Sequence, residues 1–233
     1  MGQDVGAIAE RLAGVRARIA LAAARSGRRA DEVTLVAVSK TVPPEAVRAA
    51  AAAGQRVFGE NRVQEARGKI EALGPGYGWH LIGHLQRNKA KLAAGLFDLV
   101  ETLDSVELAR DLDRRAREAG RRIRVLVQVM LVGEESKNGV APREAPRLLE
   151  LAASLPGLEL AGLMAIPPWP AVAEDSRPHF ARLRELREGW DGSCCPRGAL
   201  RELSMGMSAD FEVAVEEGAT LVRVGTALFG GRP

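Results

Sequence analysis

Short apolar runs alternate along this chain with longer segments in which apolar residues recur at helical spacing. A brief, nearly continuous apolar run bounded by turn residues is typical of a buried strand, and the longer spacing is typical of an amphipathic helix. The runs that we interpret as strands lie at residues 31–40, 56–58, 79–82, 98–102, 124–130, 158–166, 202–204 and 220–224.

The segments between these runs have the character of helices. Residues 5–25 carry Ile8, Leu12, Val15 and Ile19 with arginines between them, which predicts an amphipathic helix before the first strand. Further helices are expected near residues 44–53, 62–73, 85–94, 104–119, 142–154, 174–190 and 209–217, with a short one after 225. Eight alternations of strand and helix favour a closed parallel barrel over an open sheet. We therefore predict an α/β fold in which residues 1–233 form a single (β/α)8 TIM-like barrel domain with an extra N-terminal helix.

The first apolar run ends on a lysine, Lys40. Strand geometry puts Val36, Val38 and Lys40 on one face, and in a barrel the strand ends carry the active site. Burial lowers the pKa of a lysine, and a neutral amine attacks an aldehyde to form an imine. The alternative is a strand-end lysine whose stem is buried and whose ammonium reaches water.

Hydroxyl and glycine residues follow the last two predicted strands, where barrels commonly bind a phosphate. Ser204, Ser208, Gly225 and Thr226 suit such a site, although ordinary turns and helix caps would use the same residues. Arg223 lies within an apolar strand just before the second loop, and a buried guanidinium needs a partner. That partner is either a ligand or a glutamate elsewhere in the barrel.

The composition argues against nucleic-acid binding and against contact with a membrane. The chain has 33 basic and 30 acidic residues, a net charge of +3, and only 4% aromatic residues. Nucleic-acid binding is not indicated, since it needs a basic tract, usually with aromatic stacking platforms. No apolar run approaches the ~18 residues of a membrane helix, and the N-terminus does not resemble a secretion signal, so we expect a cytoplasmic protein without membrane contact.

The cysteines and histidines indicate neither a disulfide framework nor a metal site. Cys194 and Cys195 are adjacent, so a bridge between them would need a strained ring. His80, His84 and His179 show no metal-ligand spacing. We interpret His80 as a hydrogen-bonded core histidine, and His84 as a somewhat better candidate for chemistry because it lies in a rim loop.

An imine-forming lysine, a phosphate site and an arginine on one rim suggest pyridoxal phosphate. Several segments, in the same order along the chain, resemble the pyridoxal phosphate homeostasis protein family. These segments are 37–41, 58–61, 63–65, 79–83, 85–86, 88–89, 162–167, 203–208 and 222–226.

The resemblance implies a barrel like the N-terminal domain of alanine racemase, which binds pyridoxal 5'-phosphate and serves its supply in the cell without an established reaction. It implies that Lys40 holds the cofactor as an imine, that Asn61 lies beside the ring, and that Arg223 faces the pyridine nitrogen. The residues that it implies around the phosphate are Ser204, Ser208, Gly225 and Thr226. The expected partners are apo-enzymes that need the cofactor, and the expected state is a monomer or weak dimer.

Three positions leave the detail of the site open. Arg62 stands where many relatives have tyrosine, and Met130 where many have asparagine, so the polar surroundings of the ring are uncertain. Lys137 is either a second amine near the rim or a solvated loop lysine.

Two other functions compete with the carrier. One is a racemase-like enzyme that uses the same cofactor; the other is a barrel aldolase in which Lys40 attacks a sugar phosphate directly. The racemase is disfavoured because the resemblance assigns its second acid/base group to a tyrosine, whereas Tyr77, the one tyrosine here, precedes the third strand at the remote rim.

Overall fold

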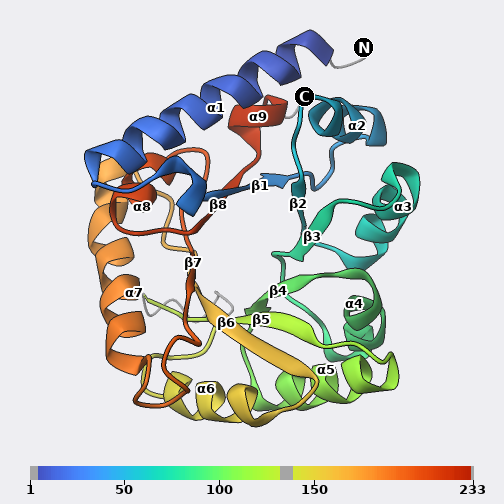
Figure 1. Cartoon of the computed structure of the whole chain (residues 1–233), viewed down its shortest axis with the longest axis vertical. Helices are drawn as coiled ribbons and strands as arrows, with labels where there is room; N and C mark the ends of the chain where they lie inside the picture. The colour runs from blue at the N-terminus through green and yellow to red at the C-terminus, as the bar shows by residue number, and fades with distance from the viewer. Residues whose placement is uncertain (1–4, 132–138, 232–233) are drawn as a thin grey trace.

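The computed structural model describes residues 5–131 and 139–231, in which eight parallel strands close into one barrel (Figure 1). The strands are β1 Thr34–Val38, β2 Val57–Glu60, β3 Gly78–Leu81, β4 Leu99–Leu103, β5 Ile123–Gln128, β6 Leu158–Met164, β7 Glu202–Ser204 and β8 Leu221–Val224. They follow chain order around the barrel, and β8 pairs with β1 to close it. The predicted (β/α)8 architecture is confirmed.

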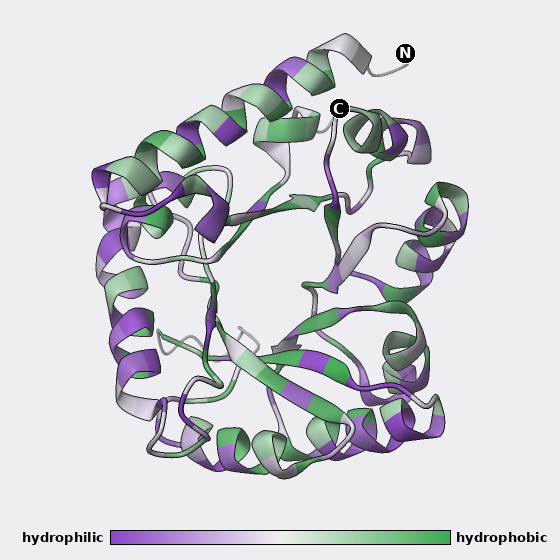
Figure 2. Ribbon diagram, in the orientation of Figure 1, coloured by the Kyte–Doolittle hydropathy of each residue, from purple (hydrophilic) through white to green (hydrophobic). Residues whose placement is uncertain are grey.

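Helices surround the barrel, and an additional N-terminal helix runs across one side of it (Figure 1). The helices are α1 Val5–Arg25, α2 Pro44–Ala52, α3 Val63–Leu73, α4 Ala90–Leu96, α5 Val106–Glu118, α6 Ala145–Ser154, α7 Arg177–Trp190, α8 Phe211–Glu216 and α9 Thr226–Phe229. Three 3-10 turns lie at Ala30–Glu32, Arg87–Lys89 and Ala173–Ser176. Figure 2 shows strands that are largely apolar and helices whose residues alternate between apolar and polar.

Several predicted helix starts are too early: α6, α7 and α8 begin at Ala145, Arg177 and Phe211 instead of 142, 174 and 209, and two further cases have a clear cause. The helix expected from residue 85 begins at Ala90, because the residues before it form a 3-10 turn. The helix expected from Asp104 begins at Val106, because the Ser105 hydroxyl accepts a hydrogen bond from the Leu108 N–H and caps it. Asp104 instead contacts His84 on the neighbouring loop, with 3.1 Å between Oδ2 and Nδ1.

The barrel interior is packed with apolar side chains at its centre. The buried residues of this inner cluster are Val36, Leu99, Leu126, Ala161, Met164 and Leu221. Val36 belongs to it, and Val38 and Lys40 line a pocket above it, so the predicted alternation along β1 is confirmed. The apolar cluster therefore closes the barrel interior below the pocket.

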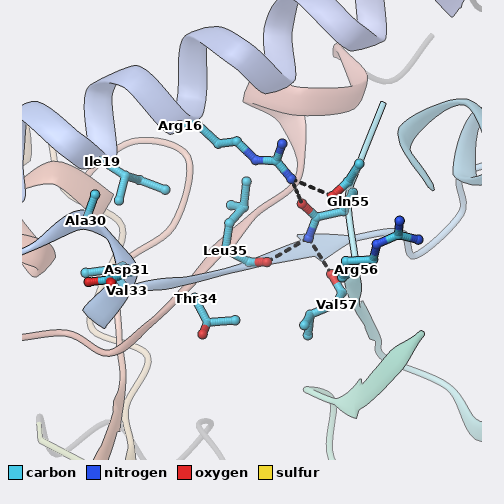
Figure 3. A pocket seen from close by; sticks show the side chains of 11 residues that line it. Arg16, Ile19, Ala30, Asp31, Val33, Thr34, Leu35, Gln55, Arg56 and Val57 are labelled. Carbon is cyan, nitrogen blue, oxygen red and sulfur yellow. Dashed lines mark hydrogen bonds between the residues drawn. The ribbon is translucent and has the colours of Figure 1, made fainter. Parts of the chain in front are cut away.

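Helix α1 is fixed to the amino-terminal ends of β1 and β2 by a buried amide (Figure 3). The Gln55 Nε2 group donates hydrogen bonds to the carbonyls of Leu35 and Val57, both at 2.7 Å. The Arg16 guanidinium on α1 donates to Gly54 O at 2.8 Å and to Gln55 Oε1 at 3.4 Å. These bonds connect the extra helix to two strands at once, and a hollow of about 390 Å³ lies around them.

We expect Gly162→Ala to destabilise the fold, because a β-carbon there would collide with the Glu202 carbonyl on the adjacent strand. Overpacking of this kind costs about 1–3 kcal/mol, which urea denaturation would detect as a lower midpoint. Gly14→Ala is the matched control: its β-carbon meets open space in the middle of α1 and should stabilise by about 0.5–1 kcal/mol. An unchanged midpoint for Gly162→Ala would show that β6 and β7 separate freely.

Candidate functional site

A pocket of about 230 Å³ opens at the carboxyl-terminal rim of the barrel, where active sites of this fold lie. Its lining residues are Val38, Lys40, Asn61, Ile82, Ile166, Trp169, Met207, Ser208, Arg223, Gly225 and Thr226. Six of the seven predicted site residues are among them: Lys40, Asn61, Ser208, Arg223, Gly225 and Thr226. Residues that are up to 186 positions apart in the sequence therefore meet in one pocket, as the strand order predicts.

The backbone around Lys40 is held on both sides of the residue. The strand ends at Val38, the buried Ser39 hydroxyl donates to Glu60 Oε1 at 2.6 Å, and Lys40 itself is half-buried. Thr41 has a φ of 62°, and its N–H donates to Glu65 Oε1 at 2.5 Å. Left-handed backbone is unfavourable for a β-branched residue, so it persists only where surrounding contacts hold it. The contacts of Ser39 and Thr41 therefore fix the direction in which the Lys40 side chain points.

A second, buried lysine completes this support. Lys69 on α3 donates to Ser39 O at 2.5 Å, to Glu60 Oε1 at 2.8 Å and to Glu65 Oε1 at 2.6 Å. Burial raises the pKa of Glu60, and the hydrogen bonds from Lys69 and Ser39 oppose that rise. The sequence signal for this cluster is a charged residue, Glu60, at the end of an apolar strand, together with Glu65 and Lys69 one helical turn apart.

A chain of polar side chains crosses the barrel interior beneath the pocket. Arg223 donates to the Ala165 carbonyl at 2.9 Å and to the Ser204 hydroxyl at 2.5 Å. Ser204 in turn donates to Glu101 Oε2 at 2.5 Å, and 2.7 Å separates Glu101 Oε1 from His80 Nδ1. Ser204 is fully buried and does not line the pocket, which places it under Arg223.

Both alternatives for Arg223 therefore apply: it has a glutamate partner, with 3.8 Å between Nη1 and Glu101 Oε2, and it also faces the pocket. Burial lowers the pKa of Arg223, and the charge of Glu101 opposes this, so the guanidinium remains cationic. Burial acts to raise the pKa of Glu101, but His80, Arg223 and Ser204 together hold it below its ordinary value. Glu101 was not predicted, although a carboxylate on the inward register of β4, two residues after Leu99, is a usable signal.

The loops after β7 and β8 bring hydrogen-bond donors to one side of the pocket. The Ser208 hydroxyl accepts hydrogen bonds from the N–H groups of Gly225 at 3.2 Å and Ala227 at 3.3 Å. A β-carbon on Gly225 would lie 3.4 Å from the Val38 carbonyl oxygen, an ordinary contact, so the last loop runs directly beside the end of β1. These N–H groups hold the Ser208 hydroxyl in position, and the hydroxyls of Ser208 and Thr226 can donate to one anion in the pocket.

The other residues singled out in the sequence lie apart from this pocket. His84 is exposed in the loop after β3, and Arg62 and Met130 are not among the lining residues. Tyr77 precedes β3 at the opposite rim, where its ring meets Phe58. Lys137 lies outside the described residues.

An apolar edge of the pocket was missed by the sequence analysis. Ile166 and Trp169 follow β6 and are 38% and 73% exposed. Ile166 was predicted as the last residue of the strand 158–166, whereas β6 ends at Met164. Trp169 lies in the proline-rich connection that follows, where no periodicity distinguished it from an ordinary loop residue.

The hollow beneath α1 is larger, but it lies at the amino-terminal ends of the strands, where this fold does not place active sites (Figure 3). Arg16 and Gln55, which line it, bind each other and the backbone, which is the pattern of a structural contact.

Within residues 5–131 and 139–231, no three His, Cys, Asp or Glu side chains gather as a metal site, and both cysteines are unbridged thiols. None of the helices in these ranges combines the length and apolar character needed to cross a bilayer.

Comparison with known proteins agrees with the segments that suggested a family. The model of the family "Alanine racemase, N-terminal domain" matches residues 11–233. A pyridoxal phosphate homeostasis protein of Aquifex aeolicus is 47% identical over 224 residues, which cover 96% of this chain and 97% of the relative.

Solved structures show the same fold. PipY of Synechococcus elongatus PCC7942, solved with PLP bound, superposes with a TM-score of 0.84 at 42% identity, covering 96% of this chain and all of that one. An alanine racemase of Corynebacterium glutamicum, at 17% identity and a TM-score of 0.69, shares the fold over 62% of its own length. The chain thus belongs to the alanine racemase N-terminal domain family and, within it, to the pyridoxal phosphate homeostasis proteins.

Proposed function

We propose that this protein binds pyridoxal 5'-phosphate in the rim pocket, with Lys40 holding the cofactor as an imine, and that it serves cofactor supply without catalysing a reaction. The observation that carries the proposal is that an amine and a set of anion-binding donors line one pocket. The PLP-bound structure of PipY, a relative with 42% identity, supports it.

The pocket residues match the functional groups of the cofactor. The Lys40 amine suits an aldehyde, and Ser208, Gly225 and Thr226 suit a phosphate dianion on the side formed by the last two loops. Asn61 and Ile82 supply an amide and an apolar side chain for an aromatic ring. When bound, pyridoxal phosphate supplies a reactive aldehyde on an electron-withdrawing ring.

Ser204 takes a different part in this proposal from the one first expected. Its hydroxyl is engaged by Arg223 and Glu101, so it orients the guanidinium and leaves the phosphate to the other residues. A guanidinium kept charged in this way would be suited to donate a hydrogen bond to the pyridine nitrogen of the bound cofactor. That contact favours an unprotonated nitrogen, which makes the ring a weak electron sink.

The racemase alternative lacks, among the described residues that line the rim pocket, the tyrosine that the resemblance assigns as its second acid/base group. Tyr77 lies at the amino-terminal ends of the strands, and Arg223 disfavours ring protonation. The relative from Aquifex aeolicus is named for homeostasis of the cofactor, which supports a role in cofactor supply. Apo-enzymes as the recipients are part of our proposal. The aldolase alternative uses no cofactor, so a yellow purified protein excludes it.

Borohydride reduction of the purified yellow protein should fix a phosphopyridoxyl group on the peptide that contains Lys40, because that lysine lines the pocket. Peptide mass spectrometry would locate the label. Lys40→Ala should remove it from this peptide, and Lys91→Ala, an exposed change on α4, should leave it in place.

Two outcomes would contradict the function as proposed. Label on a different lysine of the unaltered protein would show that the cofactor binds at another site. Saturable racemisation of alanine by the loaded protein, lost in Lys40→Ala, would replace the carrier with an enzyme.

Pyridoxal without its phosphate should bind at least about a hundredfold more weakly, because two charge-assisted hydrogen bonds of about 1.5 kcal/mol each correspond to more than that factor. Thr226→Val removes one hydroxyl at almost constant volume and should weaken pyridoxal phosphate by about tenfold while leaving pyridoxal unchanged. Titration of the imine absorption band with each aldehyde measures both effects. Equal affinities for the two aldehydes would mean that the last two loops are ordinary turns.

Glu101→Gln should destabilise the protein by about 3–5 kcal/mol, since it leaves the buried Arg223 without its carboxylate. The pKa of Glu101 is below the ordinary 4.5 in the folded state, so its contribution to stability is present above that value and lost as the pH falls through the folded pKa. Denaturation from pH 7 to pH 3 should show this loss in the unaltered protein and its absence in Glu101→Gln. The exposed Glu150→Gln is the control, and an equal effect of the two changes would remove the special role of Glu101.

A further inference from the structure

A second hollow, of about 400 Å³, adjoins the rim pocket, and Asn61 lines both. It lies between the loops that follow β2 and β3. We call it the side pocket, and its lining residues are Asn61, Arg62, Val63, Gln64, Gly83, His84, Leu85, Gln86 and Lys89.

The side pocket is cationic. Its lining includes Arg62 and Lys89 but no carboxylate, and neither cation has a carboxylate within 4 Å in the part of the chain that the structure describes. The nearest acidic groups are already engaged: Glu65 accepts from Lys69, and Asp104 contacts His84. The Arg62 charge acts on Glu65 from a distance, but no carboxylate lines the hollow that Arg62 and Lys89 face.

The walls of the side pocket are held in place. Gly83 packs against the backbone of Asn61 so closely that a β-carbon on it would overlap the Asn61 carbonyl. The Thr102 hydroxyl donates to Gly83 O at 2.8 Å, which attaches this loop to the end of β4. A hollow between fixed loops is suited to bind a ligand, since little conformational entropy is lost on association.

The side pocket also gathers motif residues that the rim pocket does not use. Gln64, Gln86 and Lys89 belong to the segments 63–65, 85–86 and 88–89, none of which contributes a side chain to the rim pocket. Amide and ammonium groups at these positions can donate several hydrogen bonds to one acceptor.

We propose that the side pocket binds the oxyanion of a small molecule, a carboxylate or a phosphate, that lies beside the cofactor pocket across Asn61. Arg62 and Lys89 supply the charge, and Gln64 and Gln86 supply further donors. The inference depends on the proposed function only for what occupies the rim pocket.

The test uses protein that has been loaded with pyridoxal phosphate and reduced with borohydride, so that the rim pocket is filled covalently. Inorganic phosphate and malonate are titrated separately, by calorimetry and by the amide NMR shifts of the loops after β2 and β3. Loading is scored by absorption beforehand. A failure to load counts against the proposed function, and a failure to bind either anion counts against this inference.

We expect one saturable site for at least one of the two probes. Arg62→Gln and Lys89→Gln should each weaken binding by about tenfold, the loss of one charge-assisted contact. Arg62→Lys should retain most of the affinity. Arg87→Gln is the matched control, because Arg87 lies in the same turn as Lys89 but binds Asp111 at 2.7 Å and does not line the side pocket; it should change nothing.

Binding of phosphate alone identifies a phosphorylated ligand, and binding of malonate alone identifies a carboxylate ligand. Binding of both supports the shared oxyanion chemistry. No saturable binding at millimolar concentration, or binding that neither Arg62→Gln nor Lys89→Gln weakens, would overturn the proposal.

Discussion

The paired charges of Glu101 and Arg223 are the constraint on which the interior of this barrel depends. Neither group can be buried alone, because desolvation of an isolated charge costs far more than one contact returns. Each therefore requires the other; the Ser204 hydroxyl donates to Glu101 Oε2, the oxygen nearest Arg223, and His80 Nδ1 lies 2.7 Å from the other oxygen, Oε1. The Arg223 guanidinium is therefore oriented and charged before any ligand enters the pocket.

The same principle organises the outer side of β1. Lys69 on α3 donates to Glu65, on the same helix, and to Glu60, at the end of β2, and Lys69 and Glu65 bind the peptide groups that flank Lys40. Two polar clusters, one inside the barrel and one between barrel and helix, thus determine the geometry of one pocket. The apolar layers beneath them supply stability without specifying where an amine or a guanidinium points.

The architecture and most of the candidate site could be predicted because they depend on local patterns. Alternation places Val36 and Lys40 on the inner face of β1, and the order of the strands brings Gly225 close to them. Ser204 shows what the sequence could not predict. Its hydroxyl binds Glu101, 103 residues away on β4, and Arg223 on β8, and nothing in the residues around Ser204 indicates either contact. Glu101 and Lys69 did leave local signals, but the partners that give them their roles, Arg223 and Ser39, lie far from them in the sequence and leave no periodic pattern.

Trp169 and Ile166 determine how the enthalpy of ligand binding at the rim pocket depends on temperature. Both expose much of their surface at the edge of the pocket. A ligand seated there covers apolar area, and removal of apolar area from water lowers the heat capacity of the complex. Association at this pocket should therefore become more exothermic as temperature rises.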